Sequence, residues 1–143
     1  MITPLDIKII LPALVLMLIT FVVWLNMLLR RIAFIKSNNI DVENYPTSDA
    51  LNRVLSERVQ APANCYRNLF EVPIIFYALT VFLVISSHVD TVFLNLAWAF
   101  VGLRALQACV HCTYNRVMHR FYAYLSSSVI LCVMVLRFFL LLF

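Results

Sequence analysis

The chain has 143 residues, of which 64% are hydrophobic and 13% charged, and it contains one glycine. A water-soluble domain of this length would be far more polar, so the composition indicates an integral membrane protein. The formal net charge of +4 comes from basic residues beside apolar segments and not from a basic tract, which argues against nucleic-acid binding.

Four apolar segments follow one another along the chain. Each is about long enough to cross a hydrocarbon core of ~30 Å as a helix that rises ~1.5 Å per residue. We expect the helices at about residues 9–29, 68–85, 91–112 and 121–143. The predicted fold class is therefore all-α, a four-helix transmembrane bundle that forms a single membrane domain over residues 1–143.

The largest polar segment, residues 30–67, is predicted to be a cytoplasmic loop. Within it, Ser48 is expected to cap a short amphipathic helix over Asp49–Val59, and Pro62 is expected to interrupt the pattern before the second span. The segment is interpreted either as a connector packed on the cytoplasmic face or as a lid over a site.

The orientation follows from the distribution of Lys and Arg. The second connection contains no Lys or Arg, whereas the first and third contain several, among them Arg30, Arg31, Lys36, Arg53, Arg58, Arg116 and Arg120. The positive-inside rule therefore predicts that both termini lie outside (N-out and C-out), with the first and third connections in the cytoplasm. With no organellar signal recognised, we expect a multi-pass protein of a bacterial inner membrane.

Two cysteines, Cys109 and Cys112, have the CxxC spacing of some metal and redox sites. They lie inside a helical segment, and no second pair of ligands has a matching spacing, so no metal site is predicted. We interpret the cysteines as small buried hydrophobic residues.

The second and third spans should form an antiparallel hairpin around His88. Glu71 lies 17 residues before His88 and Arg104 lies 16 residues after it, so the two charges should be at one depth. An unpaired charge there would cost roughly 2.5–3.5 kcal/mol. We therefore expect an ion pair between Glu71 and Arg104, either within one hairpin or between neighbouring subunits.

Two polar stripes accompany this pair, one on each helix of the hairpin. Residues three, four or seven apart share a helix face. The stripes are Asn64, Asn68 and Glu71 on the second span, and Arg104, Gln107 and His111 on the third. They are interpreted either as hydrogen bonds that hold helices together or, preferentially, as a cytoplasmic-side site for a charged small molecule. Arg104 with Arg30, Arg116 or Arg120 would suit carboxylates.

Several motifs resemble one family. They are Leu28-Leu29-Arg30-Arg31-Ile32-Ala33-Phe34, Glu57-Arg58-Val59, Asn68-Leu69-Phe70-Glu71-Val72-Pro73 and Arg104-Ala105-Leu106-Gln107. Together with four short helices they resemble the MAPEG family, the membrane-associated proteins of eicosanoid and glutathione metabolism. The resemblance extends over essentially the whole chain.

The resemblance implies a homotrimer that binds glutathione between subunits, with a lipophilic substrate arriving from the membrane lipids. Asn68 and Glu71 match the family's tripeptide-binding pair, and Arg104 matches its third-helix arginine. Arg116 or Arg120 would activate the thiol. Asn64 stands where glutathione-using members often have arginine, and the remaining candidates for the cofactor site are Arg30, Gln107 and His111.

The function expected from this resemblance is a glutathione-dependent transferase or peroxidase that acts on a lipophilic electrophile at the cytoplasmic side. The alternative is a non-catalytic trimeric membrane protein that binds lipid or a partner and has a degenerate glutathione site. A small transporter or channel subunit is a third interpretation. The single carboxylate on the hairpin, opposite an arginine, argues against a cation pathway.

Overall fold

The computed structural model describes residues 4–143, with residues 48 and 49 described by their backbone alone. All regular structure in these residues is helical, which confirms the predicted all-α class. The helices are α1 (Pro4–Ser37), the 3₁₀ helix η1 (Val42–Asn44), α2 (Ser48–Val54), α3 (Glu57–Ile85), α4 (Thr91–Cys112) and α5 (Val117–Leu141).

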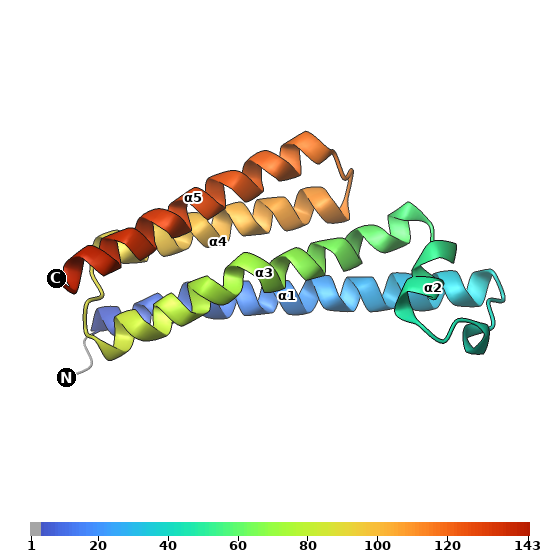
Figure 1. The fold of residues 1–143 in the computed structure, drawn as a ribbon, viewed down its shortest axis with the longest axis horizontal. Helices are drawn as coiled ribbons and strands as arrows, with labels where there is room; N and C mark the ends of the chain where they lie inside the picture. The colour runs from blue at the N-terminus through green and yellow to red at the C-terminus, as the bar shows by residue number, and fades with distance from the viewer. Residues whose placement is uncertain (1–3) are drawn as a thin grey trace.

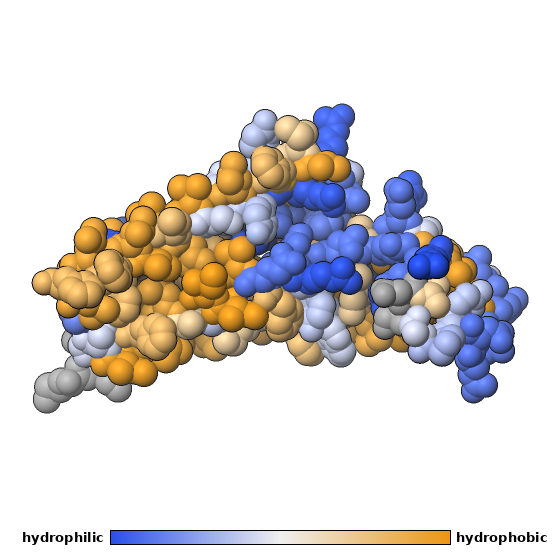
Figure 2. All heavy atoms as spheres, viewed as in Figure 1, coloured by the Kyte–Doolittle hydropathy of each residue, from blue (hydrophilic) through white to orange (hydrophobic). Residues whose placement is uncertain are grey.

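The long helices run side by side in two pairs, α1 with α3 and α4 with α5 (Figure 1). The pair α1 and α3 extends beyond the other pair at the end where α2 lies, and the C-terminus lies at the opposite end. Within the described residues, four helices, α1, α3, α4 and α5, are long and apolar enough to span a membrane. Figure 2 shows that apolar side chains cover the end near the C-terminus, whereas hydrophilic ones gather toward the α2 end. The predicted four-helix membrane architecture is thus confirmed.

The first and second spans are longer than predicted, so the predicted loop 30–67 is wrong at both ends. The helix α1 continues past Arg30 to Ser37 because basic residues are good helix formers, and a membrane boundary does not end a helix. It ends where Asn39 adopts a left-handed conformation with φ of 49°. The amide of Ile40 then donates to the carbonyl of Ile35 at 3.1 Å, which closes the helix.

The predicted helix Asp49–Val59 is also wrong, because it is divided between α2 and the start of α3. Thr47, not Ser48, is the N-cap of α2, and its side chain accepts a hydrogen bond from the amide of Ala50 at 3.2 Å. The backbone is extended at Leu55 (φ −73°, ψ 138°), which ends α2 before α3 begins at Glu57.

The helix α3 runs through Pro62, where an interruption was predicted. A proline has no amide hydrogen, so the carbonyl of Arg58, four residues earlier, loses its helical donor. Arg30 replaces that donor, since its Nη1 donates to the Arg58 carbonyl at 3.2 Å. Its Nη2 donates to the carbonyl of Cys112 at 3.0 Å. One guanidinium therefore joins α1, the start of α3 and the end of α4.

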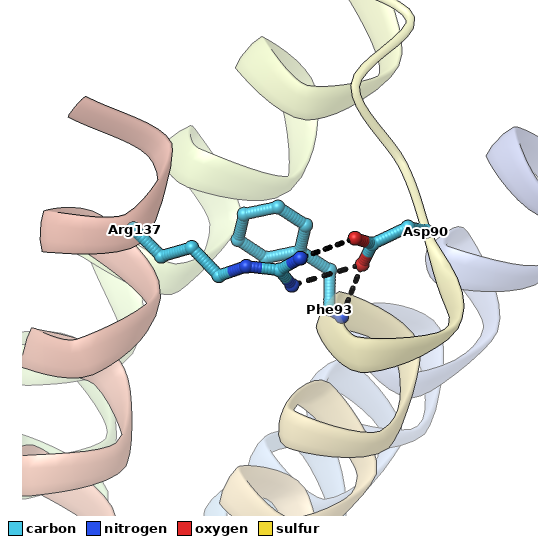
Figure 3. A network of polar contacts seen from close by, with 3 residues as sticks. All are labelled: Asp90, Phe93 and Arg137. Carbon is cyan, nitrogen blue, oxygen red and sulfur yellow. Dashed lines mark hydrogen bonds and ion pairs between the residues drawn. The ribbon is translucent and has the colours of Figure 1, made fainter. Parts of the chain in front are cut away.

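At the other end of the bundle, Asp90 joins α4 to α5 (Figure 3). Its carboxylate accepts from the amide of Phe93 at 2.8 Å and so caps α4. Arg137 on α5 donates to both carboxylate oxygens, and its guanidinium carbon lies 4.5 Å from the centre of the Phe93 ring. This is the one ion pair among the side chains that the structure describes.

Candidate functional site

Five of the six residues of the two polar stripes line one cavity of about 580 Å³ between α3, α4 and α5. Asn64, Asn68 and Glu71 come from α3, and Gln107 and His111 come from α4, as the depth matching predicts. The other lining residues are Arg67, Val117, Arg120, Phe121 and Tyr124. In Figure 2 hydrophilic side chains form a continuous region beside the apolar one, where the two helix pairs separate.

Arg104 lies beneath this cavity and is completely buried. Its Nη1 donates to Oε1 of the cavity-lining Gln107 at 3.0 Å. Its guanidinium carbon lies 4.9 Å from the centre of the Tyr124 ring and 5.4 Å from that of Phe100. The Nε and Nη2 atoms have no hydrogen-bond partner within the described part of the chain.

The ion pair expected between Glu71 and Arg104 does not form within one chain. No such contact occurs among residues 4–143, and the side chain of Glu71 is exposed at the cavity opening. Glu71 thus lines the cavity, whereas the buried Arg104 is linked to it through Gln107. Pairing between subunits remains a prediction.

His111 and Arg120 both line the cavity and are in contact with each other. Arg120 Nη1 lies 2.8 Å from Nε2 of His111 and also donates to Asn115 Oδ1 at 2.8 Å. A guanidinium can only donate, so Nε2 is the acceptor and the imidazole carries its proton on Nδ1. That Nδ1 is buried and has no partner within the described residues.

Two predicted site residues lie outside the cavity. Arg116 is exposed in the connection between α4 and α5, where it precedes the first residue of α5. Arg30 lines a different cavity and donates to two backbone carbonyls, as described above. Of the two arginines proposed to activate a thiol, the structure therefore brings only Arg120 to the polar stripes.

The lid interpretation of the first connection receives no support from the lining residues, which all come from α3, α4 and α5. Instead α2 lies against α1, where Arg31 Nη2 donates to Oδ1 of Asn52 at 2.8 Å. Gln60 secures the corner between α2 and α3, because its side-chain amide donates to the carbonyls of Asn52 and Leu55.

Arg67 and Tyr124 are cavity residues that the sequence analysis missed. Arg67 lies three residues after Asn64 and four before Glu71, so helical spacing already placed it on the same side of α3. Tyr124 lies four residues after Arg120 and shares its face of α5 in the same way. The packing of α5 against α4 was the missing information.

The fold defines a polytopic membrane protein, and its helix bundle contains a cavity lined by charged and polar side chains on its hydrophilic side. Residues 9–140 match the model of the MAPEG family. The match covers nearly the whole chain, so the protein belongs to this family. Membership of the family is consistent with a role in glutathione or lipid metabolism. Searches of curated proteins and of solved structures each returned no match.

Proposed function

We propose that the protein binds glutathione in the polar cavity and catalyses its reaction, as a transferase or peroxidase, with a lipophilic electrophile. The observation that carries this proposal is the convergence of Asn68, Glu71 and Arg120 on one cavity with Arg104 beneath it. Glutathione has two carboxylates, one ammonium group and one thiol. The cavity offers arginines for the carboxylates and a single carboxylate, Glu71, for the ammonium group.

The structure also offers a replacement for the missing arginine at position 64. Arg67 lines the cavity one helical turn further along α3 and is exposed to its interior. A guanidinium there can bind a carboxylate in bidentate fashion, which an asparagine cannot do. This arrangement favours a functional glutathione site over the degenerate site of the non-catalytic alternative.

In the proposed reaction, Arg120 stabilises the glutathione thiolate by its charge. The sulfur forms a bond to the electrophilic carbon of the substrate, and the leaving group departs with the electron pair of the broken bond. With a lipid hydroperoxide the thiolate instead attacks the O–O bond and releases an alcohol. A second glutathione then completes a disulfide with the oxidised sulfur and releases water.

We further propose a homotrimer in which a neighbouring chain covers the opening of the cavity. Glu71 is 14 residues before Ile85, the end of α3. At ~1.5 Å per residue it therefore lies ~21 Å from that end of the helix, which is within a hydrocarbon core of ~30 Å. An exposed carboxylate at that depth is costly against lipid. A second chain placed there removes the cost and completes the site. The cavity would face the cytoplasm of a bacterial inner membrane.

Glutathione binding tests the proposal directly. The purified protein in detergent should bind glutathione in isothermal calorimetry and conjugate it to chlorodinitrobenzene. Glu71→Gln should weaken binding about tenfold or more, since hydrogen bonds to charged groups contribute about 1.5–3 kcal/mol. The matched control is Glu57→Gln, an exposed carboxylate at the start of α3 that does not line the polar cavity. An absence of binding at millimolar glutathione would remove the proposal and leave the non-catalytic alternative.

A further inference from the structure

Cys112, the last residue of α4, lies between two cavities that are distinct from the polar cavity. On one side it lines a cavity of about 420 Å³ between α1 and α4, whose other lining residues are almost all apolar. On the other side it lines a cavity of about 410 Å³ together with Arg30, Glu57 and Arg58. The half-buried thiol is thus reachable both from an apolar groove and from a polar one.

The charge beside Cys112 favours a reactive thiol. Arg30 Nη2 is held at 3.0 Å from the carbonyl oxygen of Cys112, and both residues line the 410 Å³ cavity. The end of a helix carries negative partial charge, which would disfavour a thiolate. The guanidinium offsets that charge, and a nearby cation stabilises a thiolate.

A second thiol differs from the first in its exposure. Cys65 on α3 belongs to the buried core, and Cys112 packs against that core. Cys65 is 1% exposed, so it is closed to molecules from outside. Cys112 is therefore the one of these two cysteines that can react.

The apolar groove determines which molecules reach this thiol. Its walls are contributed by α1 residues such as Leu18 and Val22, which are exposed on a helix apolar enough to span the membrane. A molecule with a hydrocarbon chain can therefore approach Cys112 from the bilayer with its chain in the groove. Its polar end would then lie near Arg30 at the hydrophilic end of the bundle.

From these contacts we propose that Cys112 is a covalent modification site for lipophilic α,β-unsaturated aldehydes. The Cys112 sulfur forms a bond to the β-carbon, and the electron pair of the carbon–carbon double bond moves toward the carbonyl. The α-carbon finally takes a proton from water. The product is a thioether that contains the whole aldehyde, so the reaction needs no oxidant, reductant or glutathione.

The other cysteines of the chain provide internal controls for the test. Cys109 and Cys132 are both exposed, whereas Cys112 is half-buried. The full chain in phospholipid bilayers is treated with trans-2-nonenal, and adducts on each cysteine are quantified over time by peptide mass spectrometry. Cys112 should react about tenfold faster than Cys132, because Arg30 is held beside Cys112 by its hydrogen bond to the Cys112 carbonyl. Labelling in order of exposure, with Cys109 and Cys132 ahead of Cys112, would overturn the proposal.

Two further measurements separate the charge and the groove from general reactivity. Arg30→Gln should slow nonenal addition at Cys112 about tenfold and leave Cys132 unchanged, with circular dichroism to verify the fold. Propenal, which has no hydrocarbon chain to occupy the groove, should show less preference for Cys112 over Cys132 than nonenal does. If the two aldehydes show the same preference for Cys112 over Cys132, the groove does not guide the aldehyde to Cys112. Glu71→Gln should react at Cys112 like the native chain, so this site and the glutathione cavity can fail independently.

Discussion

Arg104 is the residue whose burial demands the most explanation. A buried charge is costly unless it is paired, and a cation–π contact with each of the two aromatic rings contributes only about 2 kcal/mol or somewhat more toward that cost. Gln107 takes one of its donors, while Nε and Nη2 have no partner in the described part of the chain. The proposed carboxylate ligand or the neighbouring chain would have to supply acceptors for these two donors. We infer that Arg104 is stabilised fully only in the assembled, ligand-bound protein.

The two candidate arginines for thiol activation can be distinguished by kinetics. Arg120→Leu should lower kcat for chlorodinitrobenzene conjugation about 100-fold, the effect of removing one group that stabilises developing negative charge. Arg116→Leu, four residues earlier and outside the cavity, should change kcat by less than about twofold. Steady-state kinetics at saturating glutathione measure both effects. If Arg116→Leu shows the larger loss, the cavity is not the reaction site.

The ion pair between Asp90 and Arg137 predicts a stability change in acid. Burial acts to raise the pKa of Asp90, but the hydrogen bonds from Arg137 and from the Phe93 amide outweigh it, so the pKa lies below its ordinary value. A carboxyl with a depressed pKa contributes stability above the unfolded-state value and loses it as the pH falls through the folded value. The melting temperature should therefore decline below about pH 4.

Asp90→Asn tests this assignment. The variant should have a lower melting temperature than the native chain at pH 7 and a smaller further decline between about pH 4 and pH 2. Arg137→Gln should reduce the same acid-dependent loss, because Arg137 is the main group that lowers the pKa of Asp90. Unchanged acid dependence in both variants would show that other carboxyl groups control the decline.

At the scale of the helices, apolar length predicted which segments are helical, but it did not predict where the helices end. Hydropathy marks the part of a helix that lies in the membrane, and α1 and α3 continue as helices beyond it. Their ends depend on local hydrogen bonds and on long-range ones such as that from Arg30 to Arg58, and these have no sequence period. The short turn at 86–90 lies where the second apolar run ends and the third begins, and there Asp90 also caps α4.

The end of α3 offers a test of this local control. Ser87 has φ of 55°, in the left-handed region that costs an L-residue roughly 1–2 kcal/mol. Ser87→Gly should therefore raise the free energy of unfolding by about 1 kcal/mol or less, after the added entropy of glycine in the unfolded chain. Thermal unfolding in detergent measures the change.

The neighbouring serine provides the matched control. Ser86 is right-handed (φ −83°), and its hydroxyl donates to the carbonyl of Leu83 at 3.3 Å. Ser86→Gly should lower the free energy of unfolding by about 0.5–1 kcal/mol, since it gains nothing from a glycine conformation. A shift of both variants in one direction would contradict the role of the left-handed residue.

For the whole molecule, depth matching along one hairpin was enough to predict which stripes meet in a cavity. It depends only on helical rise and on a tight turn, and both are regular. The contribution of α5, including Tyr124, could not be predicted in this way, because the rotation of a helix about its axis depends on packing. The pairing of Asp90 with Arg137, 47 residues apart, was missed for the same reason.

The proposed trimer predicts the mass of the particle in detergent. Native mass spectrometry should detect three chains, because assembly places protein against the exposed Glu71 and Arg67. A predominantly single-chain particle that still binds glutathione would contradict the proposal that a neighbouring chain completes the site. Light scattering combined with size-exclusion chromatography gives the same mass independently.

The hydrogen bond from Arg30 to the Arg58 carbonyl makes Pro62 and Arg30 thermodynamically dependent on each other. The proline creates an acceptor without a helical donor, and the arginine supplies the donor. In a double-mutant cycle, Arg30→Leu should therefore destabilise the native chain more than it destabilises Pro62→Ala, where an amide hydrogen is restored. The contribution of each residue to stability therefore depends on the other, so Arg30 and Pro62 should be replaced together when the chain is redesigned.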